Sequence, residues 1–239
     1  MDRVTGEEFD RLRAIVRDRY AASGKQADVL VALNAHNDRV LQHAEDIAAG
    51  EGLGPQDTDV LKTIAILHDI AKADTHLMHH AEIGATDAGR HLGELGKDVE
   101  FIGAVQQGIR CHMGPFPFID EEAEKHEQRT GEHVDLPRPD TSLEKLFYDA
   151  DMLALIDIGG IEKVVMLRAT TKEFIEEDVR TSAADGITAR AAAYRSAMTS
   201  VYRAVDTLFS DTARKLAAKL VQEAEQHIEQ QLSQERAHA

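Results

Sequence analysis

Apolar residues recur at three- and four-residue spacing along most of the chain. The spacing is evident at Leu12 and Val16 near the start and at Leu216 and Leu220 near the end, and it is the period that buries one face of a helix. Alternating β-branched runs and hairpin dipeptides, which indicate strands, are missing from the sequence. The pattern therefore predicts an all-α protein.

Helices are expected wherever this periodicity persists. They cover eight segments: residues 6–22, 26–49, 56–72, 79–93, 97–111, 141–157, 160–177 and 186–234. The last segment is expected to break near Ser210 and Asp211, either of which is a suitable N-cap, and residues 50–55 and 93–97 supply turns. Four of the five prolines fall between residues 113 and 140, which predicts a long loop there.

Composition and charge narrow the range of functions. The 239 residues include 27 Lys and Arg against 43 Asp and Glu, a formal net charge of −16 with His neutral. A nucleic-acid polymer is not expected as a partner, because phosphate backbones are bound by clustered basic residues. The sequence has neither an apolar leader segment nor a run of about 18 apolar residues, so we expect no membrane partner and a cytoplasmic location.

Histidine is the residue type that points to chemistry. The chain has 12 His and 1 Cys, which excludes a disulfide framework and indicates that any metal site is built from imidazoles and carboxylates. The first candidate is the pair His68-Asp69, which follows an apolar helical run. This position puts two metal-type ligands near the end of a helix.

The spacing around this pair adds further histidines. His36 precedes His68 by 32 residues, and the predicted turn at 50–55 lies midway between them. In an antiparallel helix hairpin, residues equally far from the turn lie at the same height. His80 and His112 are also 32 residues apart, so two hairpins are expected to deliver one His pair each.

A later helix offers a further carboxylate from Asp151 or Asp149, in the segment YDADML. Neutral imidazoles and carboxylates together suit Mn²⁺, Fe²⁺, Zn²⁺ or Co²⁺ and leave coordination positions open for water and a substrate oxygen. Because no thiolate takes part, a structural zinc site is not expected.

This ordered set resembles the HD-domain metal-dependent phosphohydrolase superfamily, in particular its small stand-alone bacterial members. The resemblance is carried by His36, the segment LHDIAK at 67–72, His80, His112 and the segment DADML at 149–153. It covers roughly residues 30–157. The resemblance implies an all-α bundle with long C-terminal helices, and a single domain over residues 1–239 in which 158–239 pack on the metal-binding core.

The resemblance also implies roles for individual residues. Two histidines and two aspartates would hold the primary metal: His36, His68, Asp69 and Asp151. His80 and His112 stand where members with two metals take extra ligands. Lys72 and Arg39 match a lysine and an arginine of the family that meet phosphate oxygens as cations. Asp69 would both bind metal and orient the attacking water.

The implied activity is metal-dependent hydrolysis of a phosphate ester in a nucleotide or small phosphorylated metabolite. The implied cofactor is a divalent metal, one of Mn, Fe, Mg, Co, Ni or Zn, with one site expected and a second compatible with the sequence. A di-iron oxygenase of the same superfamily and a non-catalytic signalling or ligand-binding module are the alternatives. The partner expected is a small phosphorylated substrate, and a homo-oligomer is left open.

Several nearby residues are not expected to bind the metal directly. His76 and His79 are expected to be solvated, and Asp149 is expected behind the ligands or at the surface. Residues 113–140 form either a solvated excursion or a cover over the pocket that influences substrate choice.

Overall fold

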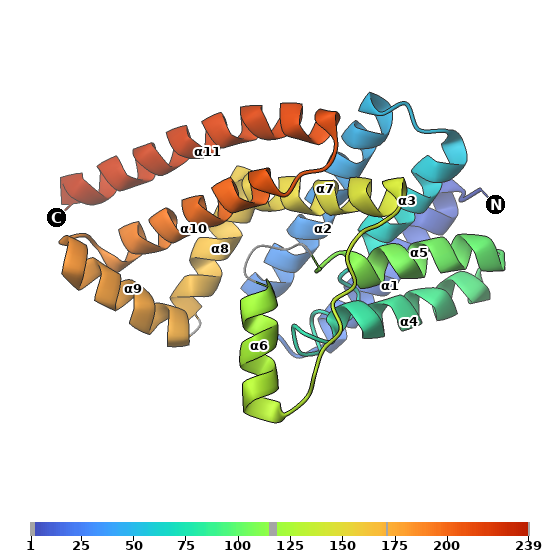
Figure 1. Cartoon of the computed structure of the whole chain (residues 1–239), viewed down its shortest axis with the longest axis horizontal. Coiled ribbons are helices and arrows are strands. Elements are labelled where there is room, and N and C mark those ends of the chain that lie inside the picture. Colours follow the sequence, from blue (N-terminus) through green and yellow to red (C-terminus); the bar gives the residue numbers. More distant parts are fainter. Residues whose placement is uncertain (1–2, 115–118, 171, 239) are drawn as a thin grey trace. The chain divides into compact units, whose positions relative to one another are not determined.

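The computed structural model describes residues 3–114, 119–170 and 172–238, and within these ranges it contains helices and no strands. The predicted all-α class is confirmed. The helices in the described part of the chain (Figure 1) are α1 Gly6–Ala22, α2 Ala27–Gly50, α3 Pro55–Leu67, α4 His80–Glu94, α5 Val99–Cys111, α6 Ile119–Thr130, α7 Ser142–Ile156, α8 Ile158–Thr170, α9 Lys172–Asp185, α10 Ala189–Asp206 and α11 Asp211–His238.

The chain divides into two compact units, Met1–Asp151 and Met152–Ala239, with the boundary inside α7. We refer to them as the N-terminal unit and the C-terminal unit. The single domain expected over residues 1–239 stays a prediction. Among the described residues, no helix combines the length and the apolar character needed to cross a membrane.

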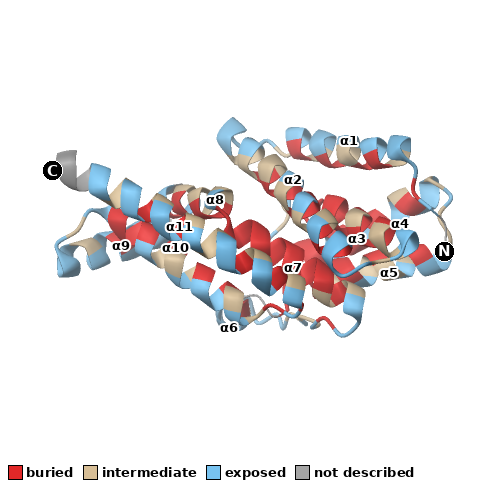
Figure 2. Ribbon diagram, turned by 90° about the horizontal axis from the view of Figure 1, so that it is seen from above, coloured by how far each residue is buried: buried red, intermediate tan, exposed pale blue. Residues whose placement is uncertain are grey.

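The N-terminal unit is built around α3. This helix is buried along most of its length (Figure 2), with Leu61, Ile64 and Leu67 almost fully inaccessible to solvent. Helices α1, α2 and α5 all pack against it. Leu12 and Val16 of α1 are buried, so the predicted apolar face of this helix is the face that meets the core.

Two helix hairpins form as the spacing predicts. Helix α2 pairs with α3, and α4 lies beside α5 (Figure 1). Gly52 and Gly96 occupy the turns with φ of +66° and +74°, a backbone conformation that glycine adopts without steric cost. Each His pair therefore lies at the open end of its hairpin, away from the turn.

The expected long loop over residues 113–140 is wrong in part, because α6 lies inside it. The prolines flank this helix rather than interrupt it. Ile119 and His126, seven residues apart, are its buried residues, and Lys125 pairs with Glu122 at 2.6 Å. Acidic residues in the first turn also favour the helix through its dipole.

Two predicted helix boundaries are also wrong. The segment 56–72 is helical only to Leu67, and the chain then runs through turns to α4. The reason is tertiary, since the Asp69 carbonyl accepts hydrogen bonds from the Tyr20 hydroxyl and from the Lys72 backbone N–H instead of continuing the helix. The segment 160–177 is two helices, because α8 ends at Thr170 and α9 begins at Lys172.

The C-terminal unit contains α8 to α11, with α10 packed against α8, α9 and α11. Arg168 and Asp178 form a buried ion pair in this unit at 2.7 Å. The partly exposed Glu162 accepts hydrogen bonds from the Tyr194 hydroxyl at 2.7 Å and from His227 Nε2 at 2.6 Å. Ser210 caps the start of α11 through a hydrogen bond from Ala213 N–H, which confirms the expected break there.

Candidate metal centre

His68 and Asp69 leave the end of α3 in a turn that is held from several sides. His68 donates its backbone N–H to Ile64 O at 2.8 Å and places its ring beside Ala65 O. The Tyr20 hydroxyl donates to Asp69 O at 2.9 Å from α1. Both side chains are fully buried, so the pair is a core feature and not an exposed helix cap.

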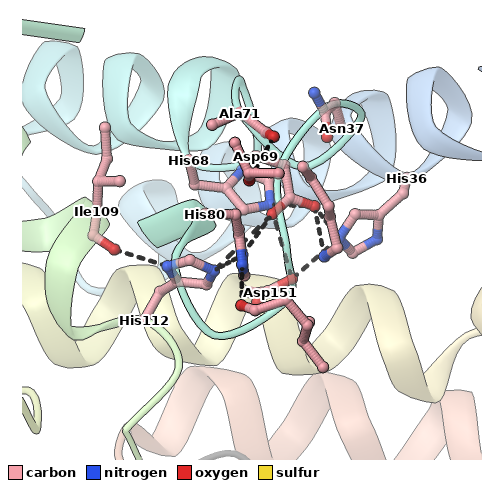
Figure 3. A network of polar contacts seen from close by, with 12 residues as sticks. His36, Asn37, His68, Asp69, Ala71, His80, Ile109, His112 and Asp151 are labelled. Atoms are coloured by element: carbon pink, nitrogen blue, oxygen red, sulfur yellow. Dashed lines mark hydrogen bonds and ion pairs between the residues drawn. The ribbon is translucent and has the colours of Figure 1, made fainter. Parts of the chain in front are cut away.

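Six side chains from three helices and two turns meet at this point (Figure 3). We call them the inner cluster: His36, His68, Asp69, His80, His112 and Asp151. All six are buried, and all belong to the N-terminal unit. These are the residues that the sequence assigned to the metal.

The first half of the inner cluster combines α2, α3 and α7. His36 Nε2 lies 3.1 Å from Asp151 Oδ1 and 3.7 Å from Asp69 Oδ2. His68 Nε2 lies 3.4 Å from the same Asp69 oxygen and 4.0 Å from Asp151 Oδ1. Four potential ligand atoms therefore surround one point. Asp149 is also buried, but Asp151 is the residue that meets His36.

The second half combines Asp69 with the α4–α5 hairpin. His80 Nε2 lies 3.2 Å from Asp69 Oδ1, and His112 Nε2 lies 3.8 Å from it. The two ring nitrogens are 3.2 Å apart. Asp69 thus offers Oδ2 to the first pair of histidines and Oδ1 to the second, which is the geometry of a carboxylate shared between two groups of ligands.

Backbone contacts fix the tautomer of three of these rings. The Nδ1 atoms of His68, His80 and His112 lie 3.0, 2.6 and 2.6 Å from backbone carbonyls three residues earlier. A carbonyl only accepts, so each Nδ1 carries a hydrogen, and Nε2 is the nitrogen that each ring can offer to a metal ion at the centre. Metal-binding histidines are commonly oriented in this way.

Charge stabilises the two carboxylates in their ionised form. Burial alone would raise the pKa of Asp69, but the adjacent His68 and Lys72 charges outweigh it and hold this pKa well below its usual value. The pKa of Asp151 is also lowered, because the hydrogen bond and charge of His36 outweigh burial. Both groups are therefore negatively charged near neutral pH.

His112 is held in the opposite state. Burial and the neighbouring rings of His80 and His68 lower the pKa of His112 to about 3. The ring is therefore neutral near pH 7. His80 Nε2 lies 3.2 Å from His112 Nε2, so the neutral His112 ring can use this nitrogen to accept a hydrogen bond or to bind a metal ion.

Unsatisfied atoms give the clearest test of whether a metal fits. His68 Nε2 and Asp69 Oδ1 are buried and have no hydrogen-bond partner, which is rare for polar atoms in a protein interior. Both atoms are directed into the inner cluster. Neutral imidazoles and ionised carboxylates are the donors that divalent transition metals prefer, so the residues present are able to hold a metal ion.

Lys72 and Arg39 occupy different positions relative to these ligands. Lys72 Nζ donates to Asp69 Oδ2 at 2.7 Å. Burial alone would lower the pKa of Lys72, but the charges of Asp69 and Asp151 raise it, so the lysine is cationic. Arg39 lies three residues after His36 on α2 and is half-buried.

The sequence did not single out Tyr20 and Asn37. Asn37 Nδ2 donates to the Tyr20 oxygen at 3.2 Å, and the Tyr20 hydroxyl donates to Asp69 O. Asn37 follows the ligand His36 directly, which was the one local signal available. Of the two histidines expected to be solvated, His76 is exposed whereas His79 is half-buried.

Comparison with known proteins adds one finding. A family model described as HD domain matches residues 34–155, a range that contains the whole inner cluster. Searches of the curated proteins and of the solved structures returned no match.

Proposed function

The chain belongs to the HD domain family, and on that premise we propose that it is a metal-dependent phosphohydrolase. The substrate we propose is a phosphate ester of a nucleotide or of another small phosphorylated metabolite. The observation that carries the proposal is the inner cluster itself, in which two buried carboxylates and four imidazoles converge beside the half-buried Lys72.

We assign two neighbouring metal positions to the inner cluster. The first is formed by His36, His68, Asp69 and Asp151, and the second by His80, His112 and again Asp69. The support for two positions is that the two oxygens of Asp69 face different histidine pairs. A divalent ion supplies Lewis acidity toward a phosphoryl oxygen and makes water a better nucleophile at neutral pH.

Three side chains would position the substrate and the attacking water. Lys72 uses one N–H on Asp69 Oδ2, and its ammonium has two further hydrogens for phosphoryl oxygens. Arg39, one helical turn from His36, is our candidate for a second cation on the substrate. Asp69 is the group that accepts a hydrogen bond from the attacking water and so orients it.

A di-iron oxygenase is the second candidate, because a carboxylate shared between two histidine pairs is also suited to two irons. Lys72 favours the hydrolase, since a cation at the ligand Asp69 matches a phosphate group. The hydrolase releases phosphate and the oxygenase consumes oxygen, so the same metal-loaded samples distinguish the two activities.

The test uses metal-depleted protein that is reloaded separately with Mn²⁺, Fe²⁺, Co²⁺, Ni²⁺, Zn²⁺ or Mg²⁺. Phosphate release is measured over a panel of nucleotides and sugar phosphates, and oxygen consumption is measured for the iron-loaded sample. We expect phosphate release with at least one metal. Asp69→Asn, which keeps the shape of the side chain, is expected to lower turnover by at least about a hundredfold because it removes the shared charge.

Metal analysis of two further variants tests the two positions. His112→Ala is expected to bind one ion fewer per chain than the wild type and to retain the ion of the first position, whereas His36→Ala is expected to lose the ion of the first position. An absence of phosphate release with every metal would refute the hydrolase, and oxygen consumption by the iron form would then favour the oxygenase.

A further inference from the structure

A separate group of side chains with metal-binding chemistry lies outside the inner cluster. His79 directly precedes α4, His126 lies on α6, and Glu132 follows α6. We propose that these three residues, the outer cluster, bind a transition-metal ion, with Zn²⁺ as the first candidate, and that this ion fastens α6 to the turn before α4. The proposal does not depend on the hydrolase activity.

The distances fit a metal ion better than hydrogen bonds. The Nε2 atoms of His79 and His126 each lie 3.5 Å from Glu132 Oε2, and the three donor atoms lie within 4.8 Å of one another. A charge-assisted N–H to carboxylate bond is shorter, at about 2.7–2.9 Å. Two ligands at about 2.0–2.1 Å from a tetrahedral zinc are separated by about 3.4 Å, which is close to the spacing seen here.

His126 supplies a second, independent observation. The residue is only 5% exposed, and its Nε2 atom is buried without a hydrogen-bond partner. Buried polar atoms in proteins are nearly always satisfied. An ion bound at this nitrogen would satisfy it and would explain why a polar ring is buried on an otherwise acidic helix.

His76 closes one side of the outer cluster without being counted as a ligand. Its ring centroid lies 4.9 Å from that of His126 and 5.9 Å from that of His79. Its Nδ1 accepts the Met78 backbone N–H at 3.3 Å, so its Nε2 carries the hydrogen and does not offer a lone pair. Three protein ligands therefore remain, and the exposed Glu132 leaves the ion open to solvent.

The outer cluster joins segments that otherwise meet through a small apolar contact. Met78 and Ala81 pack there against Met113 and Ile119. The neighbouring His79 and His80 serve different clusters, since His80 lies against Asp69 in the inner cluster. An ion in the outer cluster would thus order both α6 and the turn that ends at His79, directly before His80.

The test measures zinc binding in four preparations. Full-length, metal-depleted protein is equilibrated with Zn²⁺ alone, and bound zinc per chain is determined by dialysis for the wild type, Glu132→Gln, His126→Ala and the control His133→Ala. Glu132 is exposed, so Glu132→Gln does not threaten folding. His133 is a neighbouring histidine with a side chain that is 78% exposed, and it lies outside the outer cluster.

We expect Glu132→Gln and His126→Ala each to bind one zinc fewer per chain, and His133→Ala to match the wild type. Hydrogen exchange gives the local readout. Zinc at ten times its dissociation constant should slow exchange of the α6 amides about tenfold in the wild type and in Asp69→Asn, but not in Glu132→Gln. Unchanged zinc stoichiometry in Glu132→Gln and His126→Ala would overturn the proposal, and so would zinc protection of α6 that persists in Glu132→Gln.

Discussion

The Tyr20 hydroxyl supports the metal centre from a distance, and its removal makes a sharp prediction. It donates to Asp69 O at 2.9 Å and accepts from Asn37 Nδ2 at 3.2 Å, all within the buried core. Tyr20→Phe deletes one oxygen and keeps the buried aromatic ring. Any change it causes therefore comes from these two hydrogen bonds.

The expected loss of stability depends on which hydrogen bonds Asp69 O and Asn37 retain in Tyr20→Phe. Asp69 O still accepts the Lys72 backbone N–H at 2.9 Å, so it is not orphaned. The Asn37 amide loses the Tyr20 oxygen, and a buried donor left without a partner costs about 1–3 kcal/mol. We expect the free energy of unfolding to fall by about 2 kcal/mol, which lowers Tm by ~4–8 °C for a unit of this size.

The effect on the metal centre is the more specific readout. The Tyr20 contact fixes the backbone of Asp69, whose two oxygens serve both histidine pairs. Loss of contacts behind the ligands commonly weakens metal binding by about 10- to 100-fold. We expect Tyr20→Phe to weaken metal affinity by about tenfold, measured by competition with a chelator at a temperature where the variant is folded.

Two variants control the Tyr20 experiment. Tyr202→Phe removes an exposed hydroxyl that donates to Glu225 at 2.7 Å, and it should change stability by less than about 0.5 kcal/mol. Asn37→Leu in the Tyr20→Phe background removes the orphaned amide, so the double variant should lose less stability than the sum of the two single losses. Strictly additive losses, together with unchanged metal affinity in Tyr20→Phe, would refute the reasoning.

Two further predictions concern the fold. Hydrogen bonds from Lys97 and from the Thr5 cap of α1 lower the pKa of Glu8 from its ordinary value of 4.5. The ionised Glu8 therefore stabilises the fold above pH 4.5, and this contribution is lost as pH falls through the lowered pKa. Urea unfolding of wild type and Glu8→Gln should differ by about 1 kcal/mol near neutral pH and should converge at low pH, and a difference that persists at low pH would contradict this. A methyl group added at Gly108 would lie 2.5 Å from Ile64 Cδ1. A methyl group added at Gly103 of the same helix would have no neighbouring atom within 4 Å. Thermal melts should therefore show Gly108→Ala destabilised by about 1 kcal/mol or more and Gly103→Ala stabilised by up to about 1 kcal/mol, and equal shifts would contradict the close packing.

The sequence predicted the inner cluster better than it predicted the elements around it. Equal spacing from a turn was enough to pair His36 with His68 and His80 with His112, because helix rise is constant and short glycine turns force antiparallel packing. The choice between Asp151 and Asp149 stayed open in the sequence, since both lie on one helical segment. In the structure, packing brings Asp151 Oδ1 to 3.1 Å from His36 Nε2, and the role of Asp151 as a ligand stays a prediction.

What the sequence missed depends on contacts between distant segments. Prolines concentrated at 113–140 suggested a loop, yet the stretch between them buries Ile119 and His126 and becomes α6. Tyr20 lies 49 positions from Asp69 along the chain, and no local pattern connects them. His79 was expected to be solvated for the same reason, since the groups it meets are the distant His126 of α6 and Glu132.

The proposed substrate also has to approach a chain with a formal charge of −16. This charge acts weakly at a distance, because fields of exposed groups are screened within about 8 Å at physiological ionic strength. The groups at the inner cluster are screened much less: two ionised aspartates, the half-buried Lys72 and four imidazoles that are neutral when they bind metal. With the imidazoles neutral, as metal binding requires, the two aspartates and the lysine sum to a negative charge, and one divalent ion makes the sum positive. The metal would therefore determine not only the chemistry but also whether a phosphate group is attracted to the site.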